Sequence, residues 1–214
     1  MLKKTVLWLL VAALPLTGGC RAVRYLAYLF APGSRTRSVD AAFADLKGQR
    51  VAVVVFTDIH TQYEYPRARS RLAQRVTAEL DDKVDDVETV DPQAVLAYQR
   101  ENPYWDAEDK TALAERFDAD YVLFVAVTEY AMREPGSTTL YRGRITAEAS
   151  VYEGGVPERA ARIWQTDRVA TRYPEDAAMG NPEGSLIRIR DRTEQRFVAK
   201  LVKNFYKHRE EVEP

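Results

Sequence analysis

Arg50-Val-Ala-Val-Val-Val-Phe56 is the stretch of this 214-residue chain that says most about its fold. A strand with one exposed face alternates apolar and polar residues, but this run is apolar at every position from Val51 to Phe56. Such a run is typical of a strand inside a sheet that is covered on both faces. Tyr121-Val-Leu-Phe-Val-Ala-Val127 has the same character. The two runs therefore predict the central strands of one sheet.

Helical patterns lie between these two strands. After a polar, aromatic loop over residues 57–65, Pro66 is predicted to open a helix whose apolar residues recur every four positions: Ala68, Leu72, Val76 and Leu80. A short strand over 87–90 leads to a second helix, from Asp91-Pro92 to about Arg100. Asp106 is predicted to cap a third helix before the second central strand.

After the second central strand the pattern changes to alternation. Residues 141–151 alternate apolar and polar side chains, which indicates a strand with one wet face. Gly154-Gly155 predicts a turn into a partner strand over about 160–171, and a helix is predicted from about Arg190 to His208. The predicted fold class is a single α/β domain with a mixed sheet of central strands plus an antiparallel hairpin, packed by helices. Its core is expected to include Val53, Val55, Leu72, Val76, Val122, Phe124 and Phe205.

Three features resemble a group of bacterial envelope domains. They are the opening run at 50–56, the phrase Arg116-Phe-Asp-Ala-Asp-Tyr-Val-Leu-Phe124, and the hairpin followed by a terminal helix. Together they resemble the group formed by the N-terminal domain of TolB, LpoB and CsgG, over about residues 48–207. The resemblance implies a domain that binds or positions other envelope components. No loop is long enough for the pore hairpins of CsgG-type channels, so we expect no channel.

The N-terminus has the order of a secretory signal peptide. Lys3 and Lys4 precede an uncharged, mostly apolar run from Thr5 to Leu16, and Thr17-Gly18-Gly19 precedes Cys20. The apolar run is shorter than the roughly 20 residues that a membrane-spanning helix needs. We therefore expect the segment to be removed.

Leu16-Thr17-Gly18-Gly19-Cys20 resembles the lipobox of bacterial lipoproteins, with Thr17 where that family favours leucine. The resemblance implies that Cys20 becomes the acylated N-terminus, and several acyl chains hold a protein stably on a bilayer. The alternative is an ordinary signal peptide with an incidental cysteine nearby. Cys20 is the only cysteine, so the chain has no internal disulfide and no cysteine-rich zinc site.

These features predict four regions along the chain. They are a signal peptide (1–19), a lipidated anchor and tether (20–47), an α/β envelope domain (48–208) and a C-terminal tail (209–214).

Residues 21–30 combine arginines with aromatic and aliphatic side chains, which suits either the lipid interface or packing on the domain. The chain also resembles uncharacterised planctomycete lipoproteins, which share the phrases Tyr-Leu-Phe-Ala-Pro (28–32) and Tyr-Arg-Gly-Arg (141–144). Arg21, rather than aspartate, follows Cys20, and by resemblance to the enteric system this indicates the outer membrane.

Catalytic motifs are scarce. The chain contains no phosphate-binding glycine loop, no dinucleotide fingerprint and no nucleophile elbow. His60 and His208 are the only histidines, and Asp58 with His60 could bind a metal or act as a base at the exit of a central strand. The alternative is a solvated or hydrogen-bonded loop histidine. We expect no resident metal and no cofactor.

Two groups of residues are candidates for binding. Arg67, Arg71 and Arg75 lie with Arg69 on the polar side of the first helix, where they could meet anionic lipid heads or an acidic partner, or be solvated. Tyr104 and Trp105 form a loop pair that could anchor an interface or be pinned into the domain. Lys plus Arg total 31 against 32 Asp plus Glu, so the chain lacks the basic excess of a nucleic-acid-binding protein.

The leading hypothesis is a membrane-anchored bacterial lipoprotein that acts as a non-catalytic binding or assembly module in the cell envelope. It would face the periplasm, with the bilayer and an envelope protein as its partners. The alternatives are an envelope hydrolase or metal-dependent enzyme using Asp58 and His60, and a small-ligand-binding protein.

The lipobox-like motif predicts that Cys20→Ala releases the protein from membranes or leaves it uncleaved, because the acylated thiol is lost. Membrane fractionation with mass spectrometry of the N-terminus checks this. Full membrane attachment of correctly cleaved Cys20→Ala protein would contradict the lipoprotein hypothesis.

Overall fold

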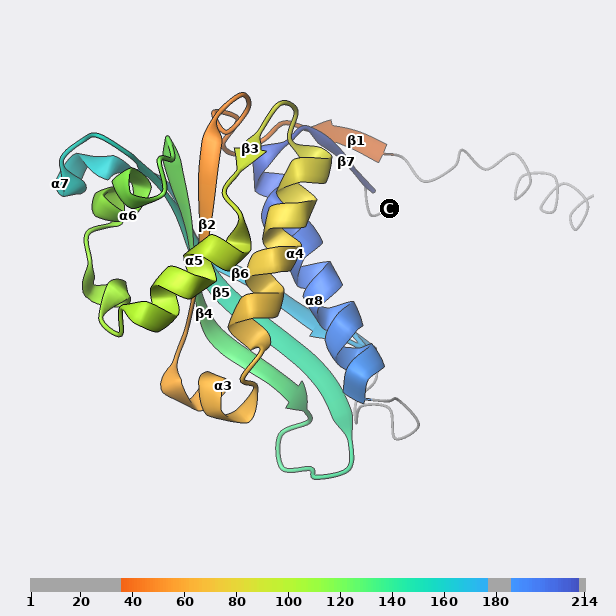
Figure 1. Ribbon diagram of the computed structural model, residues 1–214. Helices are drawn as coiled ribbons and strands as arrows, with labels where there is room; N and C mark the ends of the chain where they lie inside the picture. The colour runs from red at the N-terminus through yellow and green to blue at the C-terminus, as the bar shows by residue number, and fades with distance from the viewer. Residues whose placement is uncertain (1–35, 177–185, 212–214) are drawn as a thin grey trace, which may run out of the picture. The chain divides into compact units, whose positions relative to one another are not determined.

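The computed structural model describes residues 36–176 and 186–211 (Figure 1). The predicted signal peptide, Cys20 and the segment 21–30 lie outside the described residues. A small unit contains β1 (Thr36–Val39) and most of β7 (His208–Glu211), which pair in a two-stranded sheet. Residues 40–208 form the main unit. None of the described helices is long and apolar enough to cross a membrane.

A five-stranded mixed sheet with the order β3-β2-β4-β5-β6 forms the centre of the main unit. β2 (Arg50–Thr57) runs parallel to β3 (Glu88–Thr89) and to β4 (Tyr121–Arg133). β5 (Tyr141–Glu153) is antiparallel to β4 and to β6 (Arg162–Tyr173). Both apolar runs are interior strands, so the predicted α/β fold with a mixed sheet and an antiparallel hairpin is confirmed.

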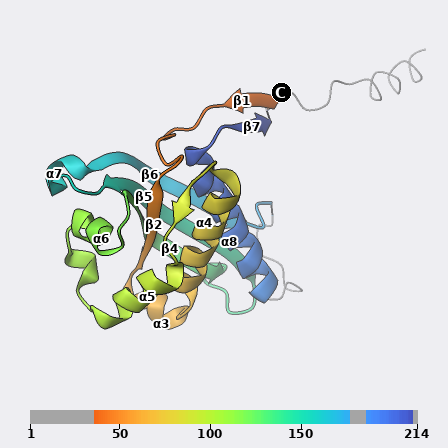
Figure 2. The same cartoon turned by 45° about the horizontal axis from the view of Figure 1, so that its top comes forward.

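Helices cover β2 on both faces (Figure 2), which explains its lack of polar alternation. Val51, Val53 and Val55 pack in one core cluster with α4 (Ala68–Lys83) and α8 (Leu186–Val202). Ala52 and Val54 pack in a second cluster with α5 (Pro92–Glu101), η2 (Trp105–Ala107) and α6 (Lys110–Arg116). Each residue of the strand thus meets apolar side chains on its own side.

The predicted core residues are buried, with one exception. Val53, Val55, Leu72, Val76, Val122 and Phe205 are at most 2% exposed, whereas Phe124 is only partly buried against the second cluster. Phe43 and Leu46, which precede the predicted domain start, are also buried in the core.

Several predicted boundaries were wrong. The expected loop after β2 contains the short helix α3 (Ile59–Glu64), because the Asp58 carboxylate accepts a hydrogen bond from the Thr61 amide and caps it. α4 begins at Ala68 rather than at Pro66, and Asp109 rather than Asp106 caps α6. The short helix α7 (Glu158–Ala161) follows the Gly154-Gly155 turn.

The terminal helix also differs from the prediction. α8 begins at Leu186, and it ends at Val202, followed by η3 (Lys203–Phe205). The Asn204 side chain donates to the Leu201 carbonyl at 2.7 Å, which satisfies a carbonyl that the helix leaves open at its end. His208 therefore begins β7 instead of ending a helix.

A bulge in β4 changes which side chains face the core. Val127 lies opposite Ala147 but Glu129 lies opposite Thr146, so Thr128 is an extra residue in β4. Strict alternation from Val127 would turn Glu129 inward and Tyr130 outward. The bulge reverses this, and Tyr130 is buried at 6% exposure.

Gly143 in β5 allows α8 to approach the sheet closely. A Cβ atom at this position would lie 1.8 Å from Oγ1 of Thr193, a fully buried α8 residue that donates to the Ile189 carbonyl. Any side chain at residue 143 must therefore push α8 away from β5.

We expect Gly143→Ala to lower the free energy of unfolding by about 1–3 kcal/mol, as for other overpacked cores. Urea unfolding followed by circular dichroism measures this. Adding Thr193→Ala should recover part of the loss because the closest atom is removed. An unchanged urea midpoint for Gly143→Ala would contradict the close approach.

Candidate functional site

A cleft of about 390 Å3 lies between the start of α4, the end of β4 and the start of α8. The segment that leads into α4 supplies Tyr65, Pro66 and Arg67 to its wall. We call it the arginine cleft, because four arginines line it: Arg67, Arg71, Arg133 and Arg190.

A buried carboxylate supports one wall of the arginine cleft. Glu194 of α8 is 0% exposed, and its oxygens accept hydrogen bonds from Arg71 Nε (3.0 Å) and Nη2 (2.7 Å). The hydroxyl of Tyr130 donates to Glu194 Oε1 at 2.6 Å, and Arg75 Nε lies 2.9 Å from Oε2. The carboxylate therefore joins α4, α8 and β4.

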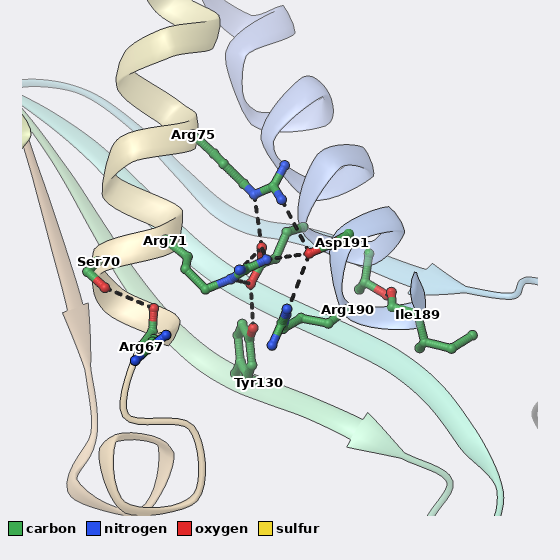
Figure 3. Close-up of polar contacts among 10 residues, drawn as sticks. Arg67, Ser70, Arg71, Arg75, Tyr130, Ile189, Arg190 and Asp191 are labelled. Atoms are coloured by element: carbon green, nitrogen blue, oxygen red, sulfur yellow. Dashed lines mark hydrogen bonds and ion pairs between the residues drawn. The ribbon is translucent and has the colours of Figure 1, made fainter. Parts of the chain in front are cut away.

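Asp191, one turn before Glu194, extends the network toward solvent (Figure 3). Its Oδ1 accepts a hydrogen bond from Arg71 and lies 3.4 Å from Arg75 Nη2 and 3.6 Å from Arg190 Nε. Because Asp191 is about 42% exposed in its side chain, these outer ion pairs are weaker than those of Glu194.

The network fixes protonation as well as geometry. Burial, and then the adjacent Glu194 carboxylate, raises the pKa of Tyr130 well above its ordinary value, so this hydroxyl stays protonated and donates. The hydrogen bond to Glu194 raises the pKa of Arg71. Both groups hold these states across the physiological pH range.

The remaining wall combines exposed charge with apolar surface. Arg67, Arg133 and Glu64 are exposed, and Leu186 is 37% exposed at the start of α8. The rings of Tyr65 and Tyr130 lie 5.0 Å apart, and the Tyr65 hydroxyl accepts a hydrogen bond from the Met132 amide. Asp191 and Glu194 offset the charge of Arg71 from behind the wall, and Glu64 is the one carboxylate among the lining residues. Arg67 and Arg133 have no ion-pair partner within the described residues, and this favours an anionic group with an apolar neighbour.

Asp58 and His60 do not line the arginine cleft. The Asp58 carboxylate caps α3 at 2.6 Å from the Thr61 amide, and this bond lowers the pKa of Asp58. His60 is exposed on α3. The described residues contain no cluster of three or more side chains suited to bind a metal ion.

The tyrosine–tryptophan pair separates in the structure. Trp105 is 4% exposed, and its ring lies 6.1 Å from that of Phe56 and 6.4 Å from that of Phe124. It is therefore pinned into the core, as one of the two interpretations held, and it offers no free contact surface. Tyr104 is 83% exposed and does not line the arginine cleft.

The predicted arginines are brought together only in part. Arg67 and Arg71 line the arginine cleft, while Arg75 pairs with the acids of α8 behind it.

Sequence reasoning missed the tyrosines Tyr65 and Tyr130 and the α8 residues Arg190, Asp191 and Glu194. One signal was present: Glu194 precedes Phe197 and Val198 on the apolar stripe of α8, where a carboxylate must find a partner.

No protein-family model matches the chain, and no curated protein sequence matches it. Among solved structures, it is similar to a PelC dodecamer variant from Paraburkholderia phytofirmans, with 14% identity over 81% of this chain and 98% of that chain (TM-score 0.46). It is also similar to lipoprotein GNA1162 from Neisseria meningitidis, with 17% identity over 60% of this chain and 85% of that chain (TM-score 0.42). The hypothetical protein CT253 from Chlamydia trachomatis is similar as well, with 13% identity over 73% of this chain and 96% of that chain (TM-score 0.40).

Proposed function

We propose that this protein is a membrane-anchored bacterial lipoprotein whose α/β domain is a non-catalytic binding module that recognises an acidic segment of an envelope protein. The arginine cleft is the observation that carries the binding role. The lipobox-like residues 16–20 support the anchor, and Arg21 supports the outer membrane, facing the periplasm. The resemblance to TolB, LpoB and CsgG domains supports an assembly role.

The cleft presents its arginines in a form suited to binding. Arg71 is already held by Asp191 and Glu194, so it loses little side-chain freedom when an anion arrives. Arg190 lines the cleft with its Nε 3.6 Å from Asp191 and without a hydrogen-bond partner among the described residues. Guanidinium groups bind carboxylates through two parallel hydrogen bonds. Arg67 and Arg133 make no ion pair within the described residues. Arg133 donates one hydrogen bond to the Thr138 carbonyl and lies over the Tyr141 ring, which leaves its charge without an acidic partner there.

The apolar part of the cleft selects the neighbour of the anionic group. Leu186 and Pro66 stand beside the arginines, with the faces of Tyr65 and Tyr130 behind them. An acidic residue next to an apolar one in a peptide segment would satisfy both surfaces. A small anionic molecule with an apolar part is the second candidate ligand for the same surface.

The enzyme alternative lacks a comparable argument. Asp58 is occupied as a helix cap, and the exposed His60 has no ligand cluster beside it in the described chain. We therefore expect His60→Ala to complement a deletion strain fully. A folded, membrane-bound His60→Ala protein that failed where cleft variants succeeded would favour the enzyme.

Site-specific photo-crosslinking tests the proposal. A photoreactive residue replaces Leu186 in the lipidated protein in its own membrane, and the adduct is captured. Arg67→Glu combined with Arg133→Glu should reduce the adduct about tenfold or more, because charge reversal in an interface costs several kcal/mol. Arg159→Glu, on the exposed helix α7, is the matched control and should leave it unchanged.

Adduct yield that is unaffected by the two cleft substitutions, in proteins with wild-type circular dichroism, would overturn the binding proposal. An adduct of small-molecule mass would assign the cleft to a small ligand instead.

A further inference from the structure

A second positively charged hollow lies at the β6 edge of the sheet, and its strand arginines lie by alternation on the face opposite α8. It has a volume of about 240 Å3 and is lined by Glu175, which follows β6, and by residues of β4, β5 and β6, including Glu129, Arg144, Thr146, Arg168 and Arg172. We call it the strand hollow. On that face, α5 and α6 pack against the β2 and β4 residues of the second core cluster. None of the residues that line the strand hollow belongs to this cluster.

Two bulges shape the strand hollow. The extra residue Thr128 in β4 places Glu129 opposite Thr146, on the outer face. In β6, Val169 lies opposite Ala147 and Thr166 opposite Ala149, so Asp167 and Arg168 together face the single residue Glu148. The two bulges flank the same short stretch of β5, and bulges often redirect side chains beside functional sites.

The carboxylates of the hollow are already neutralised. Glu129 accepts from Arg144 Nε at 2.7 Å and from the Thr146 hydroxyl at 3.2 Å. Glu175 accepts from Arg196 at 2.7 Å, and Arg196 lies outside the hollow.

Arg168 and Arg172 have no such partners. Neither makes an ion pair or a side-chain hydrogen bond with the described part of the chain, and both are exposed. Arg172 lies opposite Arg144, and Ala170, between the two arginines, lies opposite Thr146, so by alternation both share the outer face. Within the described residues, two positive charges in one hollow are therefore left without an acidic partner.

We propose that the strand hollow binds a phosphate group through Arg168 and Arg172. A phosphomonoester carries close to two negative charges at neutral pH and offers three acceptor oxygens, which match two guanidinium forks. A single carboxylate would neutralise only one of the two arginines. The open, shallow hollow suits a phosphate at the end of a larger molecule, such as a lipid headgroup, as well as free phosphate.

This site is independent of the proposed partner-binding function. The two pockets share no lining residue. The phosphate contacts also do not depend on acylation of Cys20.

Phosphorus NMR titrations of the full lipidated protein, held in an uncharged detergent, test the proposal. The probes are inorganic phosphate and the soluble headgroup analogue dihexanoylphosphatidic acid, and acetate is added as a competitor that should displace neither. Saturable binding of either phosphate probe is expected. Arg168→Gln and Arg172→Gln should each weaken it about tenfold, since hydrogen bonds to charged groups are among the strongest.

Matched variants separate this site from general charge effects. Arg162→Gln, exposed at the start of the same strand, and Arg159→Gln, exposed on α7, should leave phosphate binding unchanged. Tighter binding of the headgroup analogue than of phosphate would identify a lipid source, and equal binding would identify free phosphate. Absence of saturable binding, or binding unaffected by the folded Arg168→Gln/Arg172→Gln double variant, would overturn the proposal.

Discussion

The carboxylate of Glu194 is the group on which the arrangement of α4, α8 and β4 depends. A carboxylate with no exposed surface loses its hydration, and the cost is recovered only when charged donors surround it closely. Arg71 and Arg75 of α4 and Tyr130 of β4 supply those donors. Each of the three elements therefore has one position in which the buried charge is satisfied, and the wall of the arginine cleft is built from the same side chains.

The backbone of β4 is adapted to this requirement. The extra residue Thr128 turns Tyr130 toward Glu194 and turns Glu129 to the outer face, where Arg144 neutralises it. One bulge thus serves both pockets, the arginine cleft on one face of the sheet and the strand hollow on the other. Gly143 on the neighbouring strand lets α8 come close enough for its acids to reach the arginines of α4.

The sequence predicts the parts of this fold that follow from hydrophobic patterning. The apolar runs at Val51–Phe56 and Tyr121–Val127 are interior strands, and the alternation after Tyr141 is a half-exposed strand, because burial on two faces or one dictates these patterns. The bulge at Thr128 could not be predicted, since it depends on pairing with β5. The arginines of α4 were recognised, but their acidic partners lie about 120 residues away, beyond any local pattern. Trp105 was ambiguous because a loop aromatic has the same sequence context whether it is buried or free.

A double-mutant cycle between Arg71 and Glu194 tests the central role of the buried carboxylate most directly. Urea unfolding at neutral pH is measured for Arg71→Gln, Glu194→Gln and the double variant, with Asp85→Asn of the exposed Lys47–Asp85 pair as control. The account predicts that each single cleft variant loses about 3–5 kcal/mol of unfolding free energy, and that the double variant loses at least about 1 kcal/mol less than their sum. Asp85→Asn should lose less than about 1 kcal/mol. A Glu194→Gln loss no larger than that of Asp85→Asn, with additive effects in the double variant, would contradict the account.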